Sequence, residues 1–247
     1  MRQLHPIARD VDPTAVYAAV QFLPAADRPH LVLNFVTSLD GRVAVNGRAS
    51  GLGSAVDRAL MRQLRARADA LLVGAGTIRA EPVDPRVPPE LSDARIARGR
   101  PPQPLFVLLS ASANLPDRKL FHLPDVPVVI LTVKIADVGH LQELAPAAEV
   151  VVLGETWIDP ADVVGYLHSR GVESIVCEGG PVVAGELATA GLVDEVFLTI
   201  APTLAGGGGP RLLEGPLAAA RLDARLDLIS ASEHDGELFL RYRISRE

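Results

Sequence analysis

One stretch, from Cys177 to Leu198, constrains the fold of this chain more than any other. It reads CEGGPVVAGELATAGLVDEVFL: an apolar strand, an acidic residue, a glycine pair, a short helix and a further strand. Glycines at the carboxyl end of a strand leave the backbone without side-chain bulk. A ligand can then reach main-chain N–H groups at the start of the helix, where the dipole favours phosphate. The alternative is an ordinary strand-to-helix turn, because short glycine motifs often occur without a ligand.

Elsewhere the chain alternates between strand-like and helix-like segments. Strands are predicted at 31–37, 69–74, 105–109, 128–133, 150–153, 174–177 and 193–201, and helices at 54–68, 160–170 and 182–190. Two last strands, 222–231 and 237–244, are joined through Asp235-Gly236, a common hairpin signal. The pattern predicts an α/β fold with a mixed, mainly parallel sheet, helices on both faces and a C-terminal antiparallel hairpin. We expect an N-terminal arm over 1–29 and a single domain over 30–247.

The composition narrows the class of protein. The 247 residues carry a net charge of −6 without a dense tract of Lys and Arg, so nucleic acid is not an expected partner. No window approaches the ~18 uninterrupted apolar residues of a membrane helix, and the N-terminus lacks the apolar core of a secretory signal. A single cysteine excludes an intrachain disulfide framework, and we therefore expect a cytoplasmic protein.

A second glycine turn, Gly74-Ala75-Gly76-Thr77, also follows a predicted strand. It is not the Rossmann fingerprint, because position 79 holds Arg79 in place of a third glycine. The turn offers backbone donors and the Thr77 hydroxyl. Ligands of open α/β sheets lie beyond the carboxyl ends of the strands. We therefore expect both glycine turns to face one cleft and to hold the diphosphate of a dinucleotide.

The common nucleophile and metal motifs are missing from the sequence. The six histidines are scattered without metal-ligand spacing, and no metal site is predicted. The sequence has no HExxH, CxxC or GxSxG motif. Cys177 ends an apolar strand, where a small buried hydrophobe is the expected role rather than a nucleophile. Chemistry at this site would then come from a bound cofactor.

Several short motifs occur in one order along the chain. They are Asn34 to Gly41 (NFVTSLDG), Leu64-Arg65-Ala66 with Asp69-Ala70, Val73 to Thr77 (VGAGT), Glu178 to Pro181 (EGGP), Gly191 to Glu195 (GLVDE) and Ile200-Ala201-Pro202. Over roughly residues 30–245, this set resembles the reductase domain of bacterial riboflavin biosynthesis. That pyrimidine reductase family is related in fold to dihydrofolate reductase.

The resemblance implies a three-layer, dihydrofolate-reductase-like α/β/α fold that binds NADPH and forms a homodimer. The implied reaction is hydride transfer that reduces the ribosyl group of 5-amino-6-(5-phosphoribosylamino)uracil to the ribityl form. Cofactor contacts are implied for Gly74, Gly76, Thr77, Glu81, Gly179, Gly180 and Pro181, with Ser110 and Leu153 by the adenosine half. Substrate contacts are implied for Asn34, Ser50, Arg65 and Glu178. Arginine suits a phosphorylated substrate because its planar fork gives paired hydrogen bonds.

Each implied role has a structural alternative. Arg65 could be a solvated helix residue, and Glu178 could cap the helix that follows it. Asn34 could satisfy the strand backbone or reach the pyrimidine. Asp40 could shape its turn, which is the simpler interpretation of that residue. By location alone, Asp40 and Glu178 are the candidates for supplying a catalytic proton.

Three departures from the family pattern bear on function. The zinc-ligand motifs of the family's deaminase half are absent, which predicts a stand-alone reductase or a paralogue. The segment Ser50 to Ser54 is shorter and smaller where the family commonly has a tryptophan, and Glu81-Pro82-Val83-Asp84-Pro85 stands in place of Asp-Asp-Pro. Both changes fall where the substrate is expected. Two further hypotheses therefore stay open: a reductase of dihydrofolate or a similar pteridine, and a non-catalytic NADPH-binding protein.

Overall fold

A computed structural model describes residues 1–13, 16–115, 123, 125–144, 146, 148–215 and 223–245. The strands are β1 Arg2–His5, β2 Arg9–Asp10, β3 His30–Ser38, β4 Ala70–Gly74, β5 Leu105–Leu109, β6 Val128–Thr132, β7 Glu149–Val152, β8 Ser174–Cys177, β9 Glu195–Ala201, β10 Leu226–His234 and β11 Glu237–Ile244. The helices are α1 Ala55–Arg67, α2 Ala75–Ala80, α3 Pro89–Ile96, α4 Val138–Leu144, α5 Pro160–Ser169 and α6 Pro181–Thr189.

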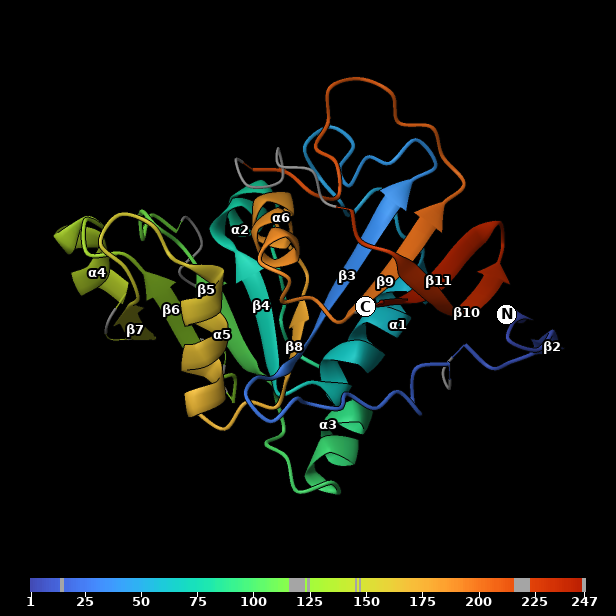
Figure 1. The fold of residues 1–247 in the computed structure, drawn as a ribbon, viewed down its shortest axis with the longest axis horizontal. Coiled ribbons are helices and arrows are strands. Elements are labelled where there is room, and N and C mark those ends of the chain that lie inside the picture. The colour runs from blue at the N-terminus through green and yellow to red at the C-terminus, as the bar shows by residue number, and fades with distance from the viewer. Residues whose placement is uncertain are drawn as a thin grey trace.

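The strands form one 11-stranded sheet in the order β2-β1-β10-β11-β9-β3-β8-β4-β5-β6-β7 (Figure 1). Pairing is parallel from β9 through β3, β8, β4, β5 and β6 to β7. It is antiparallel from β9 through β11, β10 and β1 to β2. The predicted mixed, mainly parallel sheet with a C-terminal hairpin is confirmed. The hairpin's first strand begins at Leu226, and residues 216–222 lie outside the described part of the chain.

Apolar side chains cover both faces of the sheet, and helices pack on each. In β4, Leu71 belongs to one core with Leu64 of α1, whereas the next residue, Leu72, belongs to the other with Leu187 of α6. Because successive strand residues point to opposite faces, a strand buried on both sides reads as a continuous apolar run. The three-layer arrangement is confirmed. Among the described residues, no helix has the length and apolar character that crossing a membrane requires.

Helix α1 is fixed at both ends, and it carries side chains of the site. At its start, the Ser54 hydroxyl accepts hydrogen bonds from the N–H groups of Val56 and Asp57. At its end, the guanidinium of Arg95 from α3 donates to the carbonyl oxygens of Ala66 and Ala68. Arg95 is 1% exposed, and burial lowers its pKa to about 10. Buried donors thus satisfy carbonyl groups that a helix end leaves without partners.

The N-terminal segment packs on the same body as the rest. Strand β1 extends the sheet beside β10. The backbone N–H of Tyr17 donates to Oε1 of Gln63 on α1, at 3.1 Å. The Tyr17 ring meets Phe197 of β9 edge to face, with 5.1 Å between ring centroids. Residues 1–29, expected as an arm, therefore supply both a sheet edge and part of the core.

Candidate active site

The two glycine turns meet at the carboxyl ends of the neighbouring strands β4 and β8. The N–H of Gly74 donates to the carbonyl oxygen of Gly179 at 2.6 Å. A Cβ on Gly74 would lie 2.8 Å from Val183 Cγ2, and one on Gly179 would lie 2.9 Å from Thr77 Oγ1. Gly179 also has a φ of +128°, which favours glycine, and its peptide bond to Gly180 is cis. The prediction that both turns face one cleft is confirmed.

A cavity of about 960 Å³ opens beside these turns. That volume is in the range of ligand sites, about 300–1,000 Å³. It extends from the turns to α1 and to the loops that follow β3 and α2. The predicted site residues that line it are Asn34, Ser50, Arg65, Gly74, Gly76, Thr77, Glu81, Ser110, Glu178, Gly179, Gly180 and Pro181. Asp40 and Leu153 were also predicted as site residues, but they do not line this cavity.

Arg65 and Glu178 form an ion pair in the wall of the cavity. Arg65 Nε lies 2.9 Å from Glu178 Oε1, and Arg65 Nη2 lies 2.6 Å from Glu178 Oε2. Arg65 Nη1 donates to the carbonyl oxygen of Asp84 at 2.6 Å. The side chains are 5% and 9% exposed, so Arg65 is not a solvated helix residue. Glu178 makes no cap for α6, whose N-cap is Gly180. The pair therefore fixes both side chains at the cavity wall.

Glu81 lines the cavity and also holds the loop that covers it. One carboxylate oxygen accepts from the N–H of Ala49 at 3.3 Å, and the other from the N–H of Ser50 at 3.1 Å. The acidic residue after α2 thus positions the short segment that replaces the family's tryptophan region. A cofactor contact from Glu81 stays a prediction.

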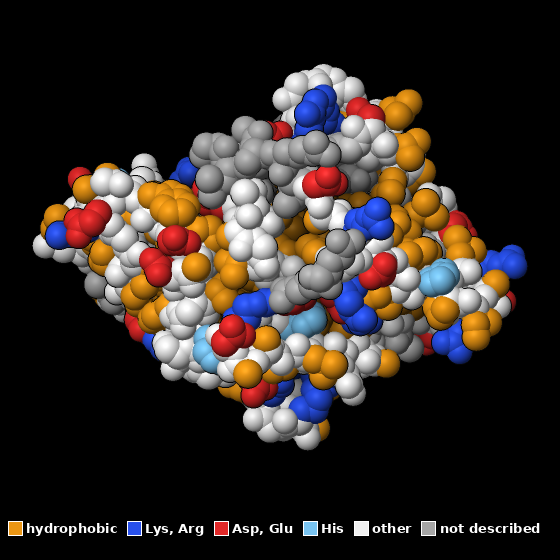
Figure 2. All heavy atoms as spheres, viewed as in Figure 1, with side chains coloured by type: hydrophobic (Ala, Val, Ile, Leu, Met, Phe, Trp, Pro, Cys, Tyr) orange, Lys and Arg blue, Asp and Glu red, His pale blue; other side chains and the backbone are white. Residues whose placement is uncertain are grey.

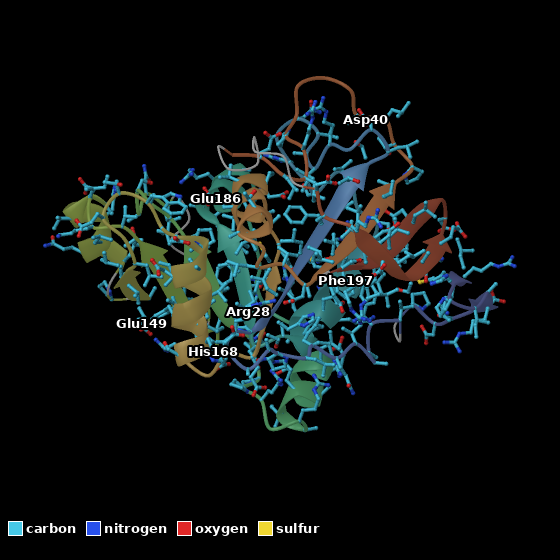
Figure 3. The ribbon with its side chains drawn as sticks, in the orientation of Figure 1. Arg28, Asp40, Glu149, His168, Glu186 and Phe197 are labelled. Carbon is cyan, nitrogen blue, oxygen red and sulfur yellow. The ribbon has the colours of Figure 1, made fainter. Side chains whose placement is uncertain are left out.

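Asp40 lies in the loop beyond β3, as Figure 3 shows, and its carboxylate is used there. Oδ1 accepts from the Ser38 hydroxyl at 2.6 Å and from the N–H of Ala205 at 2.9 Å, and Oδ2 accepts from the N–H of Gly206 at 2.8 Å. These bonds, chiefly the one from Ser38, hold the pKa of Asp40 well below its usual range. The geometry favours the interpretation that Asp40 shapes its turn.

Leu153 lies directly after β7 and does not line the cavity. Its N–H donates to the carbonyl oxygen of Thr132 at 2.9 Å, and its side chain packs in the core on the α5 and α6 side of the sheet. An adenosine contact from Leu153 stays a prediction that the cavity lining does not support.

Asp57 is the site residue that sequence reasoning missed. It projects from the first turn of α1 into the cavity. Burial raises the pKa of Asp57 to about 6; the nearby carboxylates of Glu237 and Glu178 raise it further, against a hydrogen bond from Thr199. A Cβ at Gly53 would lie 2.1 Å from Asp57 Oδ2, so the small residue before α1 makes room for this carboxyl. The sequence Ser54-x-x-Asp57 is typical of an ordinary helix start. Only the surroundings of Asp57 in the folded protein distinguish this carboxyl from a common first-turn acid.

A model of the RibD C-terminal domain matches residues 29–239. The chain belongs to the RibD C-terminal domain family. The predicted resemblance is therefore confirmed, with a match that spans the cavity and runs from β3 to the start of β11.

Named relatives of this family agree with that assignment. The chain is 32% identical over 219 residues to the 2,5-diamino-6-ribosylamino-4(3H)-pyrimidinone 5′-phosphate reductase of Methanothermobacter thermautotrophicus, covering 88% of this chain and 99% of that one. It is 29% identical over 180 residues to the riboflavin biosynthesis protein RibD of Mycobacterium tuberculosis, covering 72% of this chain and 44% of that protein.

Solved structures of the family share the fold. A pyrimidine reductase-like protein from Corynebacterium diphtheriae superposes with a TM-score of 0.84 at 29% identity, covering 96% of this chain and all of that one (100%). A deaminase/reductase from Thermotoga maritima gives a TM-score of 0.68 at 20% identity, with 57% of its length covered. At this low identity, the similarity to the Thermotoga maritima protein is evidence only of a shared fold.

Proposed function

We propose that this member of the RibD C-terminal domain family is an NADPH-dependent reductase of a 5-amino-6-ribosylaminopyrimidine 5′-phosphate in riboflavin biosynthesis. One observation carries the proposal: a single cavity joins the two glycine turns, the Arg65–Glu178 pair and the protonatable carboxyl of Asp57. The relatives' names supply the substrate class. NADPH and such phosphorylated intermediates are metabolites of the cytoplasm, where we expect the protein to act.

The glycine turns suit the diphosphate of the cofactor. Helix α6 begins directly after Gly180, so its positive dipole end and its first N–H groups face the cavity. Arg79 and Ser112 line the same cavity near the end of β5 and offer a cation and a hydroxyl for a 2′-phosphate. These residues support NADPH over NADH. When bound, the cofactor supplies the hydride.

Residues of the chain would then position the substrate and donate the proton that the reduction requires. Reduction adds the hydride to C1′ of the ribosyl group, breaks the bond from C1′ to the ring oxygen and places a proton on that oxygen. Asp57 is the group that we assign to donate this proton, because its pKa of about 6 leaves a useful protonated fraction near neutrality. Arg65 and Glu178, held rigidly to each other, would orient the substrate.

The substrate test compares three acceptors under the same conditions. The relatives' name specifies an amino group at C2 of the pyrimidine, whereas the uracil form carries an oxygen there. Purified protein with NADPH is expected to reduce one or both ribosylaminopyrimidine phosphates. The reaction is monitored by the decrease in absorbance as the reduced nicotinamide is oxidised. Faster turnover of dihydrofolate than of either pyrimidine would overturn the substrate proposal. Tight NADPH binding without turnover of any acceptor would indicate a non-catalytic binding protein.

A homodimer is also proposed, on the evidence of an apolar sheet face. Pairing places Val196 of β9 beside Tyr242 of β11, and Leu198 beside Leu240. On the same face of β10, Leu226 and Leu228 are 47% and 37% exposed. Figure 2 shows hydrophobic side chains at this end of the molecule. Exposed apolar faces of this kind often mark protein interfaces, and a second copy is the partner that we propose.

A further inference from the structure

Glu237, the first residue of β11, places a buried carboxylate behind the start of α1. The residue is 5% exposed, and it is not among the residues that line the main cavity. Its Oε1 accepts from the backbone N–H of Ser54 at 2.9 Å, and its Oε2 accepts from the Ser54 hydroxyl. A carboxylate of the C-terminal hairpin is thus bonded to the residue that caps α1.

The Ser54 hydroxyl joins Glu237 to the backbone of Asp57. Its oxygen accepts from the N–H of Val56 at 3.1 Å and from the N–H of Asp57 at 3.2 Å. These two bonds occupy both acceptor positions of a hydroxyl, so its single hydrogen is left for Glu237. Glu237 therefore fixes the orientation of the capping hydroxyl and, through it, the backbone of Asp57.

The two bonds from Ser54 favour the charged form of Glu237. Both of its oxygens act as acceptors, which is the arrangement of an ionised carboxylate. A protonated carboxyl would carry its hydrogen on one of these oxygens and would compete with one of the two donors. Hydrogen bonds to a charged carboxylate are also stronger than those to a neutral group. The negative charge of this pair of acids therefore stays on Glu237.

Two acidic residues act on Asp57 from other parts of the fold. Glu237 of β11 and Glu178 after β8 both disfavour a negative charge on Asp57, and the effect of Glu237 is the larger of the two. Glu178 is paired with Arg65, whose Nη2 lies 2.6 Å from its Oε2. The positive charge of this arginine offsets the effect of Glu178 on its surroundings.

The remaining groups near Asp57 add little charge of either sign. The Thr199 hydroxyl on β9 is a neutral hydrogen-bond donor to Asp57. Arg58 of α1 favours the charged form, but it is an exposed residue, and water weakens the effect of its charge. Burial raises the pKa of Tyr17, so its phenol stays neutral. Of the charged neighbours of Asp57, Glu237 is therefore the one that most opposes its ionisation.

We propose that Glu237 is a positioning residue of the active site, which keeps a proton on Asp57 and fixes the start of α1 from which Asp57 projects. Of two neighbouring carboxyl groups in such surroundings, one keeps its charge and the other keeps the proton. The bonds from Ser54 hold the charge on Glu237, so the proton stays on the member of the pair that lines the cavity. The inference rests on the proposed function, since it needs Asp57 as the proton donor.

A ¹³C NMR titration of the Asp57 carboxyl tests the inference without substrate or cofactor. The signal is assigned as the one that Asp57→Asn lacks. In the wild type its midpoint is expected at about pH 6. Glu237→Gln removes the charge and keeps the side-chain shape, so the midpoint is expected to fall by at least about half a pH unit. An unchanged midpoint in a folded Glu237→Gln protein would overturn the inference.

Glu195→Gln is the matched control. Glu195 is 2% exposed on β9 and accepts from Arg241 Nε at 2.7 Å. It lies roughly 13 Å along the strand from Thr199, so its substitution removes a similarly buried carboxylate at a distance from Asp57. The Asp57 midpoint is expected to stay unchanged in this variant. An equal fall in both variants would also overturn the inference, because it would be a general effect of removing buried charge.

The pH dependence of kcat separates this inference from the proposed function. If both hold, the decline of kcat with rising pH moves down by the same interval in Glu237→Gln, and kcat at about pH 7 falls by at least about threefold. A loss of kcat that is equal at all pH values, with an unmoved NMR midpoint, would indicate a structural role alone and overturn the inference. A moved NMR midpoint with an unmoved rate profile would support the control of Asp57 by Glu237 and contradict proton donation by Asp57.

Discussion

Two aspartates of this chain have opposite proton affinities because of their surroundings. Asp40 accepts three hydrogen bonds in an exposed loop, which favour its charged form. Asp57 is partly buried in the cavity wall near Glu237 and Glu178, which disfavours its charged form. Only Asp57 is therefore suited to hold a proton near neutral pH and to release it to a substrate.

Replacing Asp57 by Asn should remove the proton donor and keep the side-chain shape. We expect kcat to fall by about 10²–10⁴-fold, with a smaller change in NADPH affinity. In the wild type, kcat should decline as pH rises through about 6, where Asp57 loses its proton, and the variant should lack this limb. A pH–rate profile measures both. An Asp57→Asn enzyme with the wild-type rate and profile would contradict the assignment.

Asp57→Asn, which should lower kcat, should raise the free energy of unfolding at about pH 8. The folded pKa of Asp57, about 6, is above its ordinary value of 3.8, so between these values the folded state binds more protons than the unfolded state. Wild-type stability should then decrease as pH rises through this window, by at most about 3 kcal/mol. Asp57→Asn should be the more stable protein at about pH 8, and the difference should vanish below about pH 4. Urea unfolding at both pH values checks the sign.

At the scale of elements, sequence periodicity identified strands β3 to β11 and helices α1, α5 and α6, and it located both glycine turns, but it did not predict β1, β2 or α4. It also did not predict α3, because the segment around Pro88 and Pro89 is rich in proline and arginine, a composition typical of irregular loops. Arg95 was also beyond prediction, because a buried arginine looks like any other in a sequence. Asp57 was missed for a similar reason: its position in the first turn of a helix is common, and its burial depends on the packing of β9 and β11.

Arg95 connects helix α3 to the end of α1 by hydrogen bonds. Replacing Arg95 by Met should remove the guanidinium donor from the carbonyl oxygen of Ala68 and one of two such donors from that of Ala66, and should cost about 2–4 kcal/mol of unfolding free energy. Arg98→Met is the control: this exposed neighbour also donates to Ala66, but its loss can be made good by water. Equal losses in the two variants would show that Arg95 has no special part in holding α1.

For the whole molecule, the sheet divides into a parallel half that forms the cavity and an antiparallel half that presents the apolar face. Leu240→Arg places a charge at the centre of that face and should convert a dimer to a monomer, as measured by sedimentation. Val138→Arg adds the same charge at an exposed site on α4 and should leave the dimer intact. A wild-type protein that sediments as a monomer at micromolar concentration would contradict the dimer proposal.

The central claim is that the turns at Gly74 and Gly179 together hold the diphosphate of NADPH, and NADPH binding to Gly179→Val tests it most directly. The valine side chain would project toward Thr77. It would also separate the backbone of the glycine turn from the diphosphate. Calorimetry should show NADPH bound by the wild type and by Gly165→Ala, whose Cβ meets open space on α5, with affinity lowered at least about tenfold in Gly179→Val. Circular dichroism checks that the variant is folded. A folded Gly179→Val protein with wild-type NADPH affinity would contradict the account.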